Sequence, residues 1–262
     1  MDWNKYLYDE NEKPLDRLVT GYSYTSIFRR IGFIGDSLSS GEFETLDADG
    51  KKHFHDLYEY SWGQYIARKN GLVGFNFSRG GLTAKGYMEI FADEKGFWDP
   101  ELACQAYVIA LGVNDIFNRG MEIGTVDGDV DLSDYRNNKP TYIGYYAQIV
   151  ARYKEISPDA KFFFVTFPPH ESEKRETLGA IAIKELYRLA EVLENCYVID
   201  LHEYSPVRNA EFAAKFHLGG HLNPMGYIFT AELIDSYIDY IVRHNPEDFK
   251  YAGLINSGIK YK

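Results

Sequence analysis

Four short segments of this sequence carry residue types that can together perform acyl transfer. A serine hydroxyl is a poor nucleophile until a neighbouring imidazole accepts its proton. The tetrahedral intermediate then needs hydrogen-bond donors directed at its oxygen, which a glycine N–H and an asparagine amide can provide. The segments supply these groups in the order Ser37, Gly80 and Gly81, Asn114, and His221. We therefore predict a nucleophile, oxyanion donors and a general base among them.

These segments lie beside stretches with the pattern of buried strands and of helices. Short apolar runs are typical of strands covered on both faces, and they occur at residues 31–35, 72–77, 107–111, 162–166 and 197–199. Helix-forming stretches alternate with them, at residues 58–69, 142–156, 173–193 and from Asn223 onward. Asn223 suits a helix N-cap and Pro224 suits the first helical position. The alternation predicts an α/β fold, a three-layer α/β/α sandwich with a mainly parallel sheet.

This fold would bring the four segments to one edge of the sheet. In open parallel sheets, ligands bind at the carboxyl ends of the strands. Ser37, Gly81 and Asn114 each follow the end of a predicted strand, and His221 comes just before the last helix. We expect their functional groups to meet at that edge.

Length and composition favour a single domain. The 262 residues include 45% hydrophobic side chains, which is enough for a substantial core, and no repeat or linker divides the chain. We expect one main domain at residues 29–245, preceded by a polar N-terminal extension at 1–28 and followed by a C-terminal tail at 246–262 packed on the same domain. The loop at residues 119–140 is long enough to have a functional role.

Charge and cysteine content exclude several classes of protein. The chain has 28 basic and 39 acidic residues, a net charge of −11, so we expect no nucleic-acid partner. Cys104 and Cys196 are too few for a disulfide framework and are predicted to be buried free thiols. No stretch has the length of a membrane span, and the N-terminus lacks the pattern of a signal peptide. These features favour a cytoplasmic location.

In this order the four segments resemble the four blocks of the SGNH (GDSL) hydrolase family. Gly-Asp-Ser-Leu at 35–38 matches the first block, Gly81 (or Gly80 in its place) the second, Gly-Val-Asn-Asp at 112–115 the third, and His221 the fourth. The resemblance implies a flavodoxin-like sandwich and hydrolysis of esters or thioesters, with no metal and no organic cofactor. It also implies Ser37 as nucleophile, His221 as base, and an oxyanion hole formed by Ser37, Gly81 and Asn114.

The sequence departs from the family at one catalytic position. The family usually has an aspartate three residues before the histidine, and Leu218 stands there. An imidazole still needs an acceptor on its second nitrogen to fix its tautomer. The backbone carbonyl of Leu218 could serve, giving a Ser37–His221 dyad, and Asp200 or Glu203 are alternatives.

Other polar groups compete with this interpretation. His217 is a second candidate base, although no helix start follows it. His53, His55 and Asp56 resemble metal ligands, but no further ligand cluster accompanies them and a solvated loop is expected. The acidic residues in the 127–138 segment imitate a calcium loop with the wrong glycine and no final glutamate. Four aromatic residues near the motifs are candidates for a pocket wall: Tyr22, Tyr24, Phe43 and Phe117.

The sequence thus predicts a serine-dependent hydrolase of short-chain or carbohydrate-borne acyl esters, acetyl esters above all. No amphipathic lid helix with exposed apolar residues is apparent, which argues against a lipid-interface enzyme. Two alternatives remain open. One is a lysophospholipase or thioesterase with the same machinery. The other is a catalytically degenerate member that binds a glycan through the same cleft, which the missing aspartate suggests.

Overall fold

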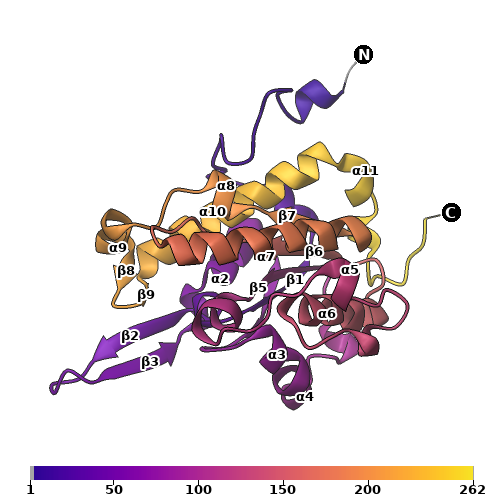
Figure 1. Cartoon of the computed structure of the whole chain (residues 1–262). Helices are drawn as coiled ribbons and strands as arrows, with labels where there is room; N and C mark the ends of the chain where they lie inside the picture. The colour runs from indigo at the N-terminus through magenta and orange to yellow at the C-terminus, as the bar shows by residue number, and fades with distance from the viewer. Residues whose placement is uncertain (1–2, 262) are drawn as a thin grey trace.

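The computed structural model describes residues 3–261. Residues 1–2 of the predicted N-terminal extension and residue 262 of the predicted C-terminal tail lie outside the described residues. Its centre is a five-stranded parallel sheet with the strand order β4-β1-β5-β6-β7 (Figure 1). The strands coincide closely with the five apolar runs of the sequence: β1 (Arg30–Gly35), β4 (Val73–Ser78), β5 (Ala106–Ala110), β6 (Lys161–Val165) and β7 (Cys196–Ile199).

Helices cover both faces of the sheet. The side chains that a strand directs to one face are apolar, and so are those that it directs to the other face. One face packs against α6 (Tyr142–Ile156) and α7 (Glu173–Val192), through residues such as Ile109 and Phe164. The other face packs against α2 (Trp62–Asn70) and α10 (Pro224–His244), through residues such as Phe33 and Val108. The predicted three-layer α/β/α sandwich is confirmed.

Capping side chains begin the main helices, at the predicted Asn223 for α10 and at Ser61, three residues after the predicted start, for α2. The Ser61 side chain accepts a hydrogen bond from the N–H of Gln64 at the start of α2, and Asn223 accepts one from Gly226 at the start of α10. Helix α2 ends at Gly71, which has a left-handed conformation. The remaining α-helices are short: α1 (Ser37–Ser40), α3 (Ala84–Gly86), α4 (Ala92–Glu94), α5 (Val126–Asp129), α8 (Leu201–Tyr204), α9 (Ala210–Phe216) and α11 (Pro246–Phe249).

Two antiparallel ribbons, which the sequence pattern did not predict, are added to the sandwich. The strands β2 (Glu42–Leu46) and β3 (Lys52–Asp56) form a hairpin that extends away from the body of the molecule (Figure 1). The residues of β3 are all exposed, so no apolar alternation marks the strand. The second ribbon pairs β8 (His217–Leu218) with β9 (His221–Leu222), and β2 contacts it.

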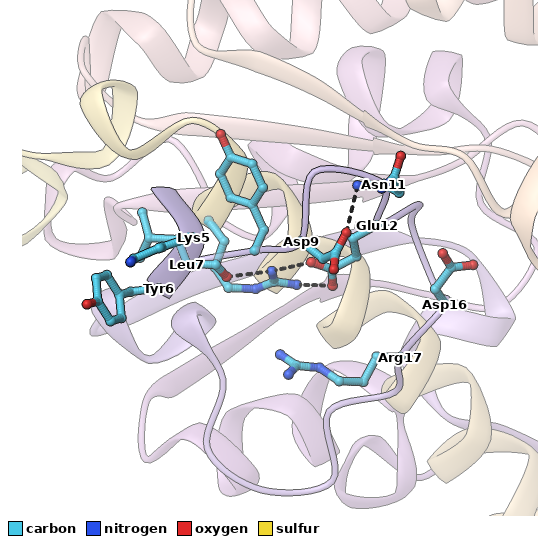
Figure 2. A pocket seen from close by; sticks show the side chains of 10 residues that line it. Lys5, Tyr6, Leu7, Asp9, Asn11, Glu12, Asp16 and Arg17 are labelled. Carbon is cyan, nitrogen blue, oxygen red and sulfur yellow. Dashed lines mark hydrogen bonds and ion pairs between the residues drawn. The ribbon is translucent and has the colours of Figure 1, made fainter. Parts of the chain in front are cut away.

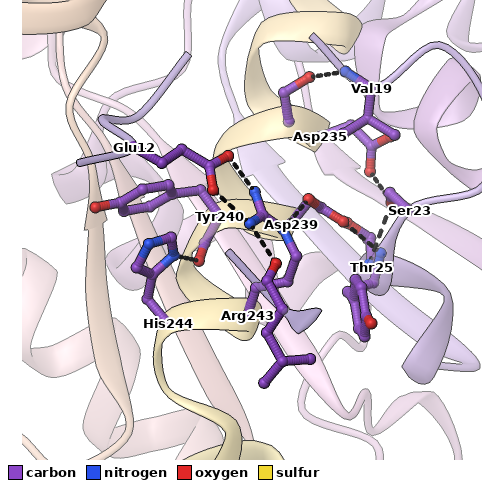
Figure 3. A network of polar contacts seen from close by, with 12 residues as sticks. Glu12, Val19, Ser23, Thr25, Asp235, Asp239, Tyr240, Arg243 and His244 are labelled. Carbon is purple, nitrogen blue, oxygen red and sulfur yellow. Dashed lines mark hydrogen bonds and ion pairs between the residues drawn. The ribbon is translucent and has the colours of Figure 1, made fainter. Parts of the chain in front are cut away.

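The N-terminal segment is fastened to α10 by buried polar contacts. Arg243, which is 4% exposed, donates to both carboxylate oxygens of Glu12 at 2.7 Å and to Asp239 at 2.7 Å (Figure 3). Nearer the start of α10, Asp235 accepts a hydrogen bond from the Ser23 hydroxyl at 2.8 Å. A cavity of about 520 Å³ lies between the first residues of the segment and Arg243 (Figure 2). The predicted extension therefore contacts α10 at Glu12 and at Ser23, whereas most other residues between 3 and 22 are not buried.

The described part of the C-terminal tail also packs on the domain. Phe249 of α11 and Ala252 lie in the apolar layer below α10, and Gln105 donates to the carbonyl of Ala252 at 2.9 Å. Cys104 and Cys196 are buried and unbonded to each other, which confirms the prediction of free thiols. Among residues 3–261, no helix combines the length and the apolar content that crossing a bilayer requires.

Candidate active site

Ser37 lies immediately beyond the carboxyl end of β1. Asp36 is the N-cap of α1 and accepts a hydrogen bond from the N–H of Leu38 at 3.1 Å, so Ser37 is the first helical residue rather than the cap. Its hydroxyl has no hydrogen-bond partner among residues 3–261 and is free to react. Gly35 is needed before this turn, because a Cβ there would lie 2.0 Å from the Ser39 hydroxyl.

Asn114 follows β5 in a short π-helix at Val113–Asn118. The turn begins at Gly112, whose φ of +125° and close contacts with Phe167 and Tyr142 exclude any side chain. The Asn114 amide nitrogen donates to the carbonyl of Leu82 at 3.1 Å and, over a longer 3.4 Å, to Asp36. The amide is thereby held beside the turn that carries Ser37.

Gly80 and Gly81 lie in the loop after β4. Gly81 has a φ of +69°, and its N–H has no acceptor among the described residues. Gly80 lies against a carboxylate, since a Cβ there would meet the Glu42 Oε2 atom at 2.0 Å. The N–H of Ser37 also has no acceptor in the described part of the chain, as expected for the first turn of a helix. Two backbone N–H groups are therefore available to a bound oxygen.

His221 is on β9 and lies between two glutamates of the protruding hairpin. Its Nε2 atom is 3.0 Å from Glu42 Oε1, and its Nδ1 atom is 3.8 Å from Glu44 Oε2. Nδ1 is buried and makes no hydrogen bond within residues 3–261. Burial lowers the pKa of His221 below its usual value, against the opposing effect of Glu44, and so favours the neutral ring. A neutral imidazole is the form that can accept a proton.

Glu44 is fixed at the base of the hairpin by several contacts. Its carboxylate accepts the N–H of Gly220 at 2.9 Å and pairs with Lys52 at 2.6 Å. These bonds lower the pKa of Glu44 and keep it ionised. Gly219 has a φ of +66°, and a Cβ there would lie 2.5 Å from the Glu44 carboxyl carbon. The glycine pair before His221 thus makes room for this carboxylate, a relation that sequence reasoning missed.

Within residues 3–261, the groups expected to orient His221 (the Leu218 carbonyl, Asp200 or Glu203) make no hydrogen bond to its ring. The Leu218 residue pairs with His221 across the β8–β9 turn, but its carbonyl makes no hydrogen bond to Nδ1, which has none. Its side chain is 47% exposed, so a carboxylate at this position would face solvent. Asp200 is the N-cap of α8, and its oxygens accept from Thr166 and Tyr187. The carboxylates beside the His221 ring are instead Glu42 and Glu44 of β2.

One cavity of about 650 Å³ is lined by the predicted nucleophile, oxyanion donors and base together: Ser37, Gly80, Gly81, Asn114 and His221. Its size is that of a small-molecule site. His217 lines it as well, so the alternative base is also present. Of the four aromatic residues proposed for the wall, Phe117 lines the cavity and Tyr22, Tyr24 and Phe43 do not.

Two buried carboxyl groups lie near Ser37: Asp36, which lines the cavity, and Asp115, which does not. Burial raises the pKa of Asp36 to about 7, helped by repulsion from Asp115 and Glu42. Burial likewise raises the pKa of Asp115 to about 6, and one of its oxygens accepts the N–H of Ala84 at 2.8 Å. Asp36 can therefore carry a proton near neutral pH, directly beside Ser37.

The segments that resembled metal sites have other partners. His53 pairs with Asp47 at 2.9 Å and His55 contacts the Thr45 hydroxyl at 3.0 Å, in strand β3 rather than in the expected loop. In the 127–138 segment, Asp131 accepts hydrogen bonds from Ser133 and Asn137. Within residues 3–261 no group of three or more potential ligands is arranged to hold a metal ion.

A parallel α/β/α sandwich with an unbonded serine hydroxyl, an asparagine amide and a histidine at one sheet edge has the groups that acyl transfer requires. Residues 33–228 match the GDSL-like Lipase/Acylhydrolase family, a span that includes all of the groups described above. The chain belongs to this family, and it is an ester hydrolase. No curated protein matches its sequence.

Solved structures share the fold at low sequence identity. A family two carbohydrate esterase from Clostridium thermocellum in complex with cellohexaose is 16% identical, with a TM-score of 0.54 over 90% of this chain and 66% of that chain. A carbohydrate esterase family 2 enzyme with a carbohydrate-binding domain, from Corynascus thermopiles, is 16% identical, with a TM-score of 0.53 over 88% and 69%. A protein from Lactobacillus plantarum is 16% identical, with a TM-score of 0.57 over 81% and 97%.

Proposed function

We propose that the protein is a serine-dependent esterase that removes short acyl groups, acetyl above all, from carbohydrate. The observation that carries this proposal is the meeting of Ser37, Gly81, Asn114 and His221 in one cavity of an acylhydrolase-family fold. Two further features support a carbohydrate substrate. Phe54 of β3 is 53% exposed beside His221 and offers an apolar face to a sugar ring. Two of the similar structures belong to carbohydrate esterases.

In this proposal Ser37 attacks the ester carbonyl and forms an acyl-enzyme. His221 takes the Ser37 proton and delivers it to the departing alcohol, and then activates the water that releases the acid. The lowered pKa of His221 favours the accepting form of the ring. Nε2 must leave Glu42 to reach the serine, so the hydrolytic state differs from this structure in that contact.

The oxyanion is stabilised by three donors. The N–H groups of Ser37 and Gly81 have no competing acceptor within residues 3–261. Asn114 contributes the amide hydrogen that now makes the long contact with Asp36, since the bond to Leu82 is the shorter of the two. Donors of this kind are effective because they are already oriented before charge develops.

We assign Glu44 as the positioning residue for His221. Its carboxylate is held by Gly220 and Lys52, and Nδ1 has no other acceptor. The present distance of 3.8 Å is longer than a hydrogen bond. Contacts between catalytic groups are often long without substrate and shorten when the substrate binds. Glu44 would thus do what the aspartate does in relatives that have one before the histidine.

The test is hydrolysis of acetylated xylo- and cello-oligosaccharides and of p-nitrophenyl esters from acetate to long acyl chains. Wild type and Ser37→Ala are compared throughout. We expect activity on acetyl esters that the substitution abolishes. An optimum at long chains would instead favour a lysophospholipase or thioesterase. Oligosaccharide binding by a wild type that hydrolyses nothing would favour the glycan-binding alternative.

A further inference from the structure

Arg208, in the loop between α8 and α9, lines the candidate active-site cavity without a carboxylate partner among residues 3–261. Arg243, by contrast, is buried and is neutralised by Glu12 and Asp239 (Figure 3). The side chain of Arg208 makes one hydrogen bond, a long contact of 3.4 Å to the Thr230 hydroxyl. A guanidinium group has five N–H donors, so most of those of Arg208 remain unused.

The position of Arg208 is fixed although its charge is not neutralised. Its backbone N–H donates to the carbonyl of Pro169 at 3.1 Å, and its guanidinium lies 5.3 Å from the centre of the Phe212 ring. Burial lowers the pKa of Arg208 to about 10. Arg208 is partly buried, and a partly desolvated cation without an anion is unfavourable, so an anionic ligand would stabilise it.

A second arginine of the same cavity is also without a carboxylate partner in the described chain. Arg175, on the first turn of α7, lies with its guanidinium carbon 5.3 Å from the centre of the Phe117 ring. The two arginines come from different segments and line one cavity with Ser37.

The carboxylates that line the cavity already have partners of their own. Glu176 accepts the N–H of His170 at 2.7 Å and contacts His202 at 2.8 Å. Glu42 contacts His221, and Asp36 caps α1. The positive charge of the arginines is therefore available to a bound molecule. The chain as a whole carries a net charge of −11 and repels anions, so a local cationic wall would be required to bind one.

We propose that Arg208, assisted by Arg175, binds an anionic group of the substrate, so that the preferred substrate is an ester that also carries a carboxylate. The planar guanidinium fork matches the two oxygens of a carboxylate. This inference rests on the proposed esterase function, because it assigns the class of ester to the same cavity. It does not require the anion to belong to the acid or to the alcohol part of the ester.

Two pairs of matched substrates test the inference. The p-nitrophenyl hemiester of succinate is compared with its neutral methyl ester, and 4-acetoxybenzoate with its methyl ester. For at least one pair we expect wild type to have a kcat/KM about tenfold or more higher for the anionic member. The Arg208→Gln variant should lose most of this ratio, Arg175→Gln part of it, and Arg208→Lys should retain more of it than Arg208→Gln.

Arg188→Gln is the matched control, because Arg188 lies on the same helix as Arg175 but pairs with Asp127 and Glu191 outside the cavity. It should keep the ratio of wild type. A wild-type ratio of one or less for both pairs, or an unchanged ratio in a folded Arg208→Gln protein, would overturn the inference.

Binding without turnover separates this inference from the proposed function. Ser37→Ala is titrated calorimetrically with 4-acetoxybenzoate, its methyl ester and inorganic phosphate. Arg208-dependent binding of the carboxylate, in a wild type that hydrolyses no ester, would support the anion site and contradict the esterase. Hydrolysis of neutral esters with no preference for the anion in binding would support the esterase and contradict the anion site. Binding of phosphate alone would contradict a carboxylate site.

Discussion

The nucleophile and the base of this site are held by different kinds of structure. Ser37 and Asn114 follow buried parallel strands, and glycines without room for a side chain set the two turns. His221 is on a two-residue strand, and its neighbours Glu42 and Glu44 come from a hairpin whose outer strand is fully exposed. The groups that follow the sheet strands, Ser37 and Asn114, form what we call the sheet side of the site. His221 and its two glutamates form the ribbon side, because they lie on the β2–β3 and β8–β9 ribbons added to the sandwich.

The largest effect expected is on the groups that exchange the proton. Replacing Ser37 or His221 by alanine should lower kcat for acetyl esters by about a thousandfold or more, and the double variant should cost little more than either alone, since the two act as a unit. Steady-state kinetics test this, with the exposed Ser133→Ala as control. Additive losses in the double variant would show that the two residues work independently.

Asn114→Ala tests the sheet side of the comparison. Removing one oxyanion donor should lower kcat by about a hundredfold, with a small change in KM, because the donor acts mainly when charge develops. Asn137, an exposed asparagine whose side chain bonds only to Asp131, is the matched control. A full kcat in Asn114→Ala would remove this residue from the oxyanion hole.

Glu44→Gln tests the ribbon side. We expect kcat to fall by about tenfold or more, because the amide positions the imidazolium less well than a carboxylate. Glu44 raises the pKa of His221, so the variant should also move the acid limb of the kcat/KM profile to lower pH. In wild type that limb should lie below pH 6.5, with activity lost as the pH falls and His221 becomes protonated.

The pH profile distinguishes positioning from a structural role. Loss of the Gly220 contact could loosen the turn, but loosening alone would not move the acid limb in this direction. Thermal melting of Glu44→Gln reports on the turn, and Glu59→Gln, an exposed change just outside the hairpin, is the control. An unchanged profile in a folded Glu44→Gln protein would argue against the assignment.

The smallest effect is expected at Glu42. Its carboxylate contacts Nε2, the nitrogen that has to take the Ser37 proton. Glu42→Gln removes the charge that holds the ring there and should raise the acylation rate about two- to fivefold, measured as the burst with p-nitrophenyl acetate. A rate reduced as strongly as in Glu44→Gln would instead mean that Glu42 supports the reactive position of the ring.

The sequence predicts the sheet side of the site far better than the ribbon side. The five strands are apolar runs because helices cover both faces, and Ser37 and Asn114 could be placed from the strands that precede them. The hairpin has no such pattern, because the side chains of β3 are exposed. Glu44 and Gly220 are 176 positions apart in the sequence, and only the tertiary structure brings them into hydrogen-bond contact. The absence of an aspartate at position 218 indicated that His221 needs another hydrogen-bond acceptor, but the sequence did not show which residue supplies it.

Labelling with a fluorophosphonate, followed by peptide mapping, tests the central claim most directly. The account predicts a single adduct, on Ser37, that forms rapidly in wild type and in Ser133→Ala and does not form in Ser37→Ala or His221→Ala. An ester-hydrolysing wild type that carries its adduct on another serine, or that leaves Ser37 unmodified, would contradict the account.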